Sequence, residues 1–317
     1  MSELNNLILK LISQRANINE ISEITKLSNK QLYYRLSLLQ FKGYVFKRRY
    51  YDNGDIGLYL DRTLKGEEDV IIKTDVNNNE FSALFISDLH FCSKYDRVDL
   101  VNKIYDFCIN NNLHCIFNAG DFLEGPINKF KNLKNNLSDN QIEYLLKNYP
   151  FDKNILNFIC FGNHDAAYLN SSGQNLAKVL ENKRYDLCPI GFEEGKIIIK
   201  DDYFYLTHPN TFEKTVPDYD IVFQGHHHKI KTHTNGKNLM FYLPTLSDIG
   251  LQTHGSFPGF SLVKFLFDNG VINEVYIQNY NFINKKIRLT SENEFILNDR
   301  KLFINEENKK LELTNNK

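Results

Sequence analysis

Apolar and polar positions along the first sixty residues follow the period of a helix and then that of a strand. Apolar side chains at helical spacing predict three helices, marked by Leu4, Leu7, Ile8, Leu11 and Ile12, by Ile21, Ile24 and Leu27, and by Leu32, Leu36 and Leu39. The run from Ser28 to Gln31 has the form of a capping box that opens the third helix. Two β-rich runs follow, with Asn53-Gly54 between them, and predict a β-hairpin.

From residue 81 onward, short apolar runs alternate with amphipathic and polar stretches. Five apolar runs predict buried strands at 81–86, 114–119, 156–161, 203–207 and 219–224. A helix is expected at about 97–110, and a second Asn-Gly hairpin at 260–277. Strand, helix and strand in this order predict parallel pairing, with the loops after the first three strands on one edge of a sheet.

Each of these five strands ends in a side chain that can bind a metal or move a proton. The ends are Ser87-Asp88-Leu89-His90, Gly120-Asp121, Gly162-Asn163-His164-Asp165, His208, and Gly225-His226-His227-His228. A single Gly-Asn turn after a strand is commonplace, whereas five such ends in succession are not. Open α/β sheets carry their sites at the carboxyl ends of their strands, so we expect one site there.

The ordered set Asp-x-His, Gly-Asp, Gly-Asn-His-Asp, His and Gly-His-x-His resembles the calcineurin-like metallophosphoesterase family, in its repair-exonuclease and phosphodiesterase branches, over residues 81–270. The resemblance implies an α/β fold of two facing β-sheets flanked by helices, with two divalent metal ions at their edge. It implies these ligands: Asp88, His90 and His228 for the first ion, Asn163, His208 and His226 for the second, and Asp121 as the bridge. It also makes His164 the proton donor to the leaving oxygen, with Asp165 orienting its ring; the alternative is that Asp165 caps the loop.

Two metal ions explain why these residue types are needed. Cations about 4 Å apart clamp the attacking and leaving oxygens of a phosphoryl group, and a metal-bound water loses its proton near neutral pH. Imidazole, carboxylate and amide ligands without thiolate suit Mn²⁺, which we expect, with Fe²⁺, Zn²⁺ or Ni²⁺ as alternatives.

Charge sets the first sixty residues apart from the rest. They hold nine Lys or Arg against five Asp or Glu, while the remainder holds 29 against 34. Three helices and a hairpin resemble a winged helix-turn-helix domain, whose third helix would lie in a major groove. The residues expected to contact nucleic acid are Lys30, Gln31, Tyr33, Tyr34 and Arg35 on that helix and Lys47, Arg48 and Arg49 on the wing. We favour DNA as the ligand of this domain. One alternative is RNA, on whose unpaired bases Tyr33 and Tyr34 would stack, and the other is protein contact or dimerisation.

The pattern divides the chain into four parts. We expect a winged helix at 1–62, a linker at 63–80, a metallophosphoesterase domain at 81–282 and a C-terminal extension at 283–317. The extension is expected as an extra strand, a helix or a homodimer contact. The Lys/Asn-rich segment 125–150 is an insertion beside the site or a solvated connector. Loops at 243–247 and 255–259 are expected to close over the site.

Two features narrow the substrate. No Arg follows Gly120-Asp121 within 122–125, which argues against a protein phosphatase. A nucleic-acid-binding domain on a short linker would raise the effective concentration of a phosphodiester at the active site. We therefore predict a metal-dependent DNA nuclease or phosphodiesterase, in a mobile element or in repair. The alternatives are a phosphodiesterase or phosphatase on a small nucleotide, and a DNA-binding regulator with a vestigial metal site.

Composition adds little beyond the class of protein. Apolar residues make up 42% and charged residues 24%, as in soluble globular proteins. No apolar run approaches the roughly 18 residues of a membrane span and no signal-peptide layout is present, so we expect a cytoplasmic protein without membrane contact. Five cysteines without CxxC pairing are expected to be reduced packing residues, with Cys92 the one considered as a ligand.

Overall fold

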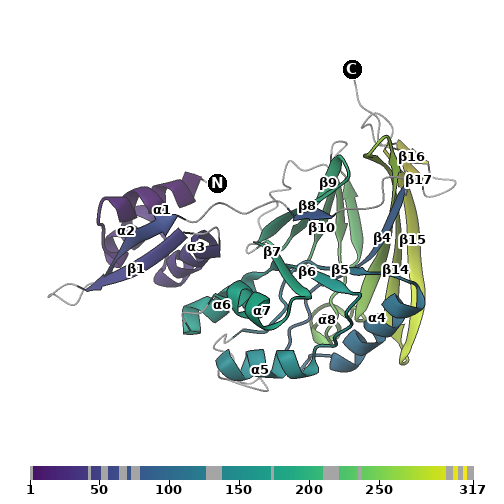
Figure 1. Ribbon diagram of the computed structural model, residues 1–317, viewed down its shortest axis with the longest axis horizontal. Coiled ribbons are helices and arrows are strands. Elements are labelled where there is room, and N and C mark those ends of the chain that lie inside the picture. The colour runs from purple at the N-terminus through teal and green to yellow at the C-terminus, as the bar shows by residue number, and fades with distance from the viewer. Residues whose placement is uncertain are drawn as a thin grey trace. The chain divides into compact units, whose positions relative to one another are not determined.

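The computed structural model describes most of the chain, in two compact units (Figure 1). The described residues are 3–41, 44–50, 56–63, 70–72, 79–125, 138–172, 175–209, 221–234, 238–297, 303–305 and 310–312. One unit comprises Met1–Glu68 with Ala166–Val179, and the other Asp69–Asp165 with Leu180–Lys317. No helix within the described ranges is long and apolar enough to cross a membrane.

The first unit begins with the helices and hairpin that the sequence predicts. Their bounds are α1 (Glu3–Ser13), α2 (Ile18–Thr25), α3 (Asn29–Phe41), β1 (Tyr44–Tyr50) and β2 (Ile56–Thr63), with β1 and β2 antiparallel. Their core consists of Ile8, Leu11, Ile12, Ile18, Ile21, Leu32, Leu36, Leu39 and Leu58. The expected turn at Asn53-Gly54 lies outside the described residues.

Reciprocal caps fix where the second and third helices begin. Asn17 and Glu20 form a capping box at α2. The predicted box at α3 is confirmed, because the Ser28 backbone N–H donates to Gln31 Oε1 at 2.9 Å and the Gln31 N–H donates to Ser28 Oγ at 3.3 Å. Ile24, one of the apolar positions that predict α2, is 54% exposed, whereas Ile18 and Ile21 of this helix are buried.

The second unit is built around two sheets. Its strands are β3 (Val70–Ile72), β4 (Glu80–Ile86), β5 (Cys115–Asn118), β6 (Leu156–Phe161), β7 (Leu187–Phe192), β8 (Glu194–Ile199), β9 (Asp202–Thr207), β10 (Ile221–Gln224), β11 (Lys231–Thr234), β12 (Leu239–Tyr242), β13 (Gly259–Asp268), β14 (Val271–Ile283), β15 (Lys286–Ile296), β16 (Phe303–Asn305) and β17 (Lys310–Glu312). The first sheet runs β7-β6-β5-β4-β13-β14-β15-β17-β16, and the second runs β8-β9-β10-β12-β11 with β3 beside β8. A single residue pair, Phe192 with Glu194, joins β7 to β8.

Strand direction brings the predicted strand ends to the same edge. β4, β5 and β6 are parallel neighbours in the first sheet, and β9 and β10 are parallel neighbours in the second. Parallel strands present their carboxyl ends at one edge of a sheet, as predicted.

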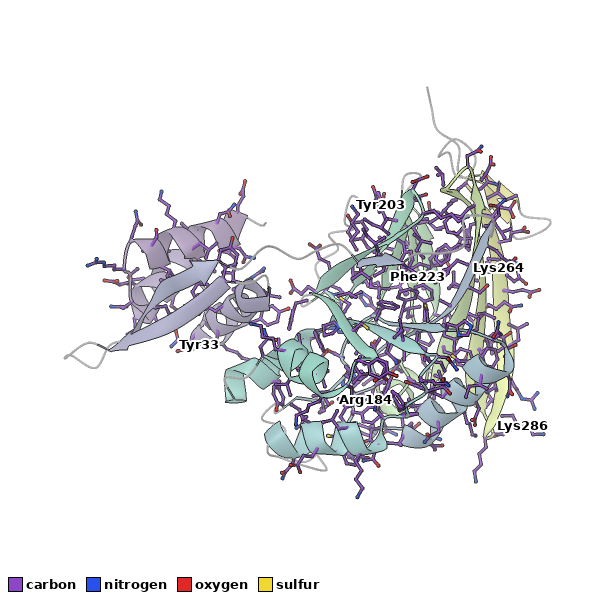
Figure 2. The ribbon with its side chains drawn as sticks, viewed as in Figure 1. Tyr33, Arg184, Tyr203, Phe223, Lys264 and Lys286 are labelled. Atoms are coloured by element: carbon purple, nitrogen blue, oxygen red, sulfur yellow. The ribbon has the colours of Figure 1, made fainter. Side chains whose placement is uncertain are left out.

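Apolar side chains, among them Phe223, fill the space between the two sheets (Figure 2). Phe85 of β4 lies 4.0 Å from Phe223 of β10, centroid to centroid, and Phe265 of β13 stacks on Phe204 of β9 at 5.1 Å. These contacts join residues of different sheets, so the sheets face one another across one core. The predicted α/β fold of two facing sheets is confirmed.

Five more helices are described, with bounds α4 (Val98–Asn110), α5 (Ser138–Asn148), α6 (Asn163–Ser172), α7 (Leu176–Lys183) and α8 (Ile249–His254). Helix α4 covers an outer face of the first sheet. Phe107 of α4 packs on Phe260 of β13 and Tyr280 of β14 at 5.0 and 5.4 Å. Because successive strand residues face opposite sides, Phe260 points away from the core that Phe265 enters. Of the segment 125–150, residues 126–137 lie outside the description.

The C-terminal part of this unit continues the first sheet. β13 and β14 form the predicted hairpin, and Asn269 (φ 49°) and Gly270 (φ 85°) have the left-handed backbone of a tight Asn-Gly turn. The segment 286–296 is a further strand, one of the three expected alternatives for the extension, and pairs antiparallel with β14.

All five cysteines are free thiols, as expected. Cys92, Cys108, Cys115 and Cys160 are buried, and burial raises the pKa of Cys108 and Cys115 to about 12. They pack as small apolar side chains.

We expect Phe265→Ala to lower the free energy of unfolding by about 3–5 kcal/mol, because the ring is fully buried between the sheets. Chemical denaturation would measure the loss. Phe257→Ala, at a side chain that is 45% exposed, is the matched control and should cost far less. Equal losses in the two variants would contradict the facing-sheet core.

Candidate metal centre

Five ligand-type residues at the strand ends share an unusual backbone. Asp88, His90, Asp121, His226 and His228 all have φ between 46° and 75°. A left-handed backbone costs roughly 1–2 kcal/mol at a residue with a Cβ, so surrounding contacts must hold it. The chain also approaches closely here: a Cβ on Gly162 would lie 2.3 Å from Asp121 Oδ1, which explains the glycine before Asn163.

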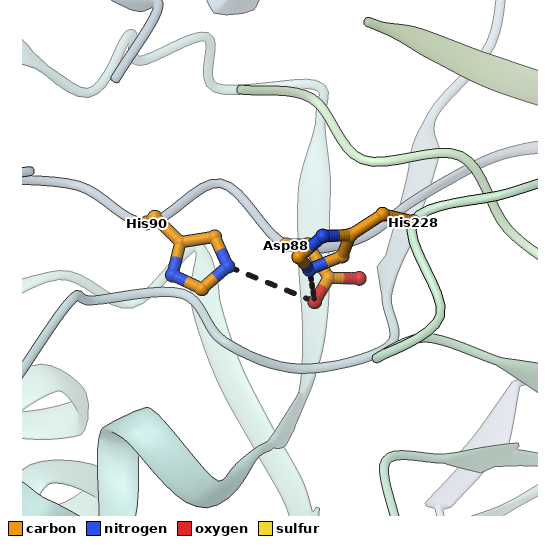
Figure 3. Close-up of side chains that lie close together, drawn as sticks. All are labelled: Asp88, His90 and His228. Atoms are coloured by element: carbon orange, nitrogen blue, oxygen red, sulfur yellow. Dashed lines mark hydrogen bonds and ion pairs between the residues drawn. The ribbon is translucent and has the colours of Figure 1, made fainter. Parts of the chain in front are cut away.

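The first cluster joins the loop after β4 to the loop after β10 (Figure 3). Its members are Asp88, His90 and His228. Asp88 Oδ1 lies 3.1 Å from His228 Nε2 and 3.8 Å from His90 Nε2. Asp88 Oδ2 instead accepts hydrogen bonds from Ser87 Oγ at 2.6 Å and from the His226 backbone N–H at 3.0 Å. One carboxylate oxygen is thus held by the protein, and the other faces the two imidazoles.

The second cluster joins the loops after β5, β9 and β10. Its members are Asp121, His208 and His226. His208 Nε2 lies 3.1 Å from Asp121 Oδ2, and the 2.7 Å contact of His208 Nδ1 with the Ala119 carbonyl makes Nδ1 the donor and turns Nε2 toward Asp121. Asn163 joins this group, because its Oδ1 lies 3.1 Å from His226 Nδ1.

Asp121, a member of the second cluster, also faces His90 of the first. Besides its contact with His208, its Oδ2 lies 3.9 Å from Nε2 of both His90 and His164. Its Oδ1 accepts a hydrogen bond from the His164 backbone N–H at 2.9 Å. The sequence-predicted ligand types are therefore brought together, and the predicted bridging residue faces members of both clusters.

The electrostatics favour ionised carboxylates. Burial raises the pKa of Asp88, but His228 and His208 lower it by more, to well below its usual range. Burial likewise raises the pKa of Asp121, and the lowering by His208 and His164 prevails. Burial lowers the pKa of His208, whereas Asp121 and Asp88 raise it to about 10. Burial and His208 together lower the pKa of His226 to about 4.

These residues fit a pair of divalent ions. Two buried carboxylates need compensating charge, and His90 Nε2 is buried without a hydrogen-bond partner although it faces both of them. Oxygen and imidazole donors without thiolate match divalent transition metals, and the buried clusters are consistent with a two-metal site.

His164 and Asp165 are arranged differently from the expectation. Asp165 does not hold the His164 ring: its carboxylate accepts hydrogen bonds from the backbone N–H groups of Gly162, Phe122 and Leu123 at 2.8, 3.1 and 2.8 Å. These donors satisfy both carboxylate oxygens, so Asp165 caps the loop, which was the alternative. Burial and Asp121 raise its pKa to about 7.

Glu124 holds the ring instead, and sequence reasoning missed it. Its main-chain carbonyl lies 2.9 Å from His164 Nδ1, and its Oε2 lies 2.9 Å from His90 Nδ1. Both rings are therefore turned with Nε2 toward the site. Burial lowers the pKa of His164, but Asp121 and Glu124 raise it above its usual value. The only signal in the sequence is that Glu124 lies three residues after Asp121 in the same loop.

The residues expected to contact nucleic acid are only partly described. Lys30 and Gln31 are exposed, and Tyr33 and Arg35 are half-buried. Tyr34 was expected to face solvent, which is wrong: it is 7% exposed, because it lies one helical turn from Leu38 on a second buried stripe of α3. Lys47, Arg48 and Arg49 are in β1, but their side chains lie outside the description.

The loop at 243–247 does not close over the site. All five residues are buried, and Thr245 and Ser247 contact the backbone of Asp88. The segment stays buried because its two hydroxyls have partners in the main chain of Asp88.

Comparison with known proteins gives a likeness in fold. No protein-family model and no curated protein matches the chain. Among solved structures, vacuolar protein sorting 29 from Cryptosporidium parvum is similar at TM-score 0.43 and 18% identity, covering 69% of this chain and 100% of that one. A dimetal phosphatase from Danio rerio is similar at TM-score 0.41 and 10% identity, covering 67% of this chain and 99% of that one. An archaeal phosphodiesterase is similar at TM-score 0.38 and 16% identity, covering 66% of this chain and 99% of that one. These values are low, so a functional assignment depends on the residues of this chain.

We expect Glu124→Ala to weaken divalent-metal binding by about 10–100-fold, because His90 loses the carboxylate that orients it. Titration calorimetry with Mn²⁺ would measure the affinity. Glu143→Ala, on the exposed face of α5, is the matched control and should bind like the wild type. Unchanged affinity in Glu124→Ala would show that His90 needs no such support.

Metal binding at the second cluster should release protons. Without an ion the pKa of His208 is about 10, so its Nε2 is protonated at pH 7 and must lose that proton to bind a cation. Affinity should therefore rise with pH, and about one proton should be released for each ion bound there at pH 7. Calorimetry in two buffers of different ionisation enthalpy measures this release. Identical heats in both buffers would contradict the prediction.

Proposed function

We propose that the protein is a metal-dependent phosphoesterase that hydrolyses phosphodiesters. The supporting observation is that two buried carboxylate–imidazole clusters lie next to each other at the carboxyl ends of strands, with Asp121 Oδ2 of the second cluster 3.9 Å from His90 Nε2 of the first. In this proposal Asp121 would be a ligand common to two divalent ions, for which Mn²⁺ is the first choice. The other ligands are Asp88, His90 and His228 for one ion and Asn163, His208 and His226 for the other.

The two ions would supply Lewis acidity to the phosphoryl oxygens and lower the pKa of the attacking water. The chain supplies the rest. His164 donates its Nδ1–H to the Glu124 carbonyl, which leaves Nε2 pointing into the site, 3.9 Å from Asp121 Oδ2. From there Nε2–H would donate a proton to the leaving oxygen. Asp165 keeps His164 in place by tying its loop to the loop after β5.

A polynucleotide is the substrate that we favour. The segment 122–125 lacks an Arg that would bind the phosphate of a phosphomonoester, and residues 1–60 carry an excess of basic side chains. In the proposal this first segment binds DNA as a winged helix and delivers phosphodiesters to the metal centre, which makes the protein a nuclease.

A small nucleotide phosphodiester is the second candidate. The buried Tyr34, and the use of Gln31 in the helix cap, reduce the surface that α3 offers to nucleic acid. In this case the first unit would serve for protein contact.

Cleavage assays with Mn²⁺ would test the proposal on labelled single- and double-stranded DNA and RNA and on bis-p-nitrophenyl phosphate. We expect Asp121→Ala to lower every rate by about a thousandfold, because several kcal/mol of transition-state stabilisation is lost with the bridge. The triple variant Lys47→Ala, Arg48→Ala, Arg49→Ala should slow polynucleotide cleavage alone.

The other outcomes distinguish the candidates. Turnover of the small diester without polynucleotide cleavage would favour the small-nucleotide enzyme. Inactivity on every substrate, with tight duplex binding retained, would favour a regulator with a vestigial site.

A further inference from the structure

A short buried segment contacts the main chain of Asp88, a member of the first cluster. The segment is residues 245–247, and Thr245 and Ser247 are both fully buried. Thr245 Oγ1 lies 2.8 Å and Ser247 Oγ 3.0 Å from the main-chain oxygen of Asp88. Between them, the Leu246 backbone N–H donates to the Ser87 carbonyl at 2.9 Å. The segment therefore binds two consecutive carbonyls of the loop that carries Asp88.

The backbone of Asp88 depends on these hydrogen bonds. Asp88 has φ 54°, and it follows the end of β4, so its carbonyl has no partner in the strand ladder. A buried carbonyl must be paired, and one carbonyl oxygen can accept two hydrogen bonds. Thr245 and Ser247 each place a hydroxyl oxygen within hydrogen-bond distance of this carbonyl, and the two hydroxyl oxygens also lie 2.9 Å from each other. They favour the left-handed conformation, since it directs the carbonyl toward them.

The same conformation decides what the Asp88 side chain can do. Oδ2 is held by Ser87 Oγ and the His226 backbone, so only Oδ1 faces His228 and His90 (Figure 3). A different backbone conformation at residue 88 would move Oδ1 away from both imidazoles. Both hydroxyls contact Asp88 at its main-chain oxygen, so they act on this residue through the main chain.

The segment itself is anchored on both sides. The Gly259 N–H donates to the Thr245 carbonyl at 2.9 Å, and the Asp248 N–H donates to the Tyr95 carbonyl at 2.9 Å. Asp248 also forms an ion pair of 2.9 Å with Arg97, at the start of α4. These contacts make residues 245–247 a fixed support for the loop.

We propose that Thr245 and Ser247 are positioning residues of the first metal site, holding Asp88 in the conformation that presents one carboxylate oxygen to the ion. The inference rests on the proposed function, because it takes Asp88 as a metal ligand. Neither hydroxyl touches the ion or the substrate. Their removal weakens the first site and leaves the second, formed around Asp121 and His208, close to its original affinity.

Calorimetric titration of metal-free protein with Mn²⁺ tests the inference without any substrate. Thr245→Val keeps the shape of the side chain and removes its hydroxyl, and Ser247→Ala does the same at the second position. We expect each to weaken one of two binding events by about 10-fold or more. Thr245→Ser restores the hydroxyl and should restore the affinity. Thr253→Val removes an exposed hydroxyl on α8, bonded to Ile249, and is the matched control.

The outcomes separate this inference from the proposed function. Thermal unfolding of each metal-free variant shows whether it is folded. If Thr245→Val does not fold, Ser247→Ala provides the test. If the wild type binds two ions and both affinities are unchanged in Thr245→Val and Ser247→Ala, the positioning role is overturned. The proposal of a metal centre is then still supported. Equal loss in Thr245→Val and Thr245→Ser would also overturn it, because the hydroxyl would then not be the cause. A wild type that binds no divalent ion would overturn both.

Discussion

Two carboxylates buried within one site, Asp88 and Asp121, impose the constraint from which the other features of the centre follow. Both are almost fully removed from solvent, and both keep a pKa below the usual range. Isolated buried charges are costly, and the imidazoles and backbone N–H groups around these two carboxylates offer positive charge or a hydrogen-bond donor. Imidazoles come from loops far apart in sequence, and backbone N–H groups of His226 and His164 supply the rest. The two sheets have to face each other for these loops to meet.

Rigid elements hold this arrangement in place. The parallel strands end at one edge, and the loops beyond them adopt left-handed backbone at five ligand-type positions. Such conformations persist only where surrounding contacts over-determine them. Asp165 ties two loops together through three backbone N–H groups, and Glu124 orients two imidazoles. Side chains that belong to neither cluster therefore account for much of the geometry.

The sequence predicted the strands and the convergence of their ends because both depend on local patterns. Apolar runs such as 156–161 identify buried strands, and a polar residue directly after each run is readable without a structure. The part played by Glu124 was not readable, since a carboxylate three residues after Asp121 has many possible partners. The position of Tyr34 was missed because helical periodicity places a side chain on a face without saying what covers that face. The partners of Thr245 and Ser247 lie 157 and 159 residues earlier, beyond any local pattern.

The position of β4 has a consequence for the order in which the protein can assemble. This strand lies between β5, which follows it closely in sequence, and β13, which the ribosome makes much later. Pairing of Phe85 with Ser261 closes one of the longest loops in the chain, and such closures are slow. The last histidine of the centre, His228, is synthesised before Thr245, Ser247 and β13. A nascent chain thus carries Asp88, His90 and His228 before it has Thr245 and Ser247, whose hydroxyls contact the Asp88 carbonyl.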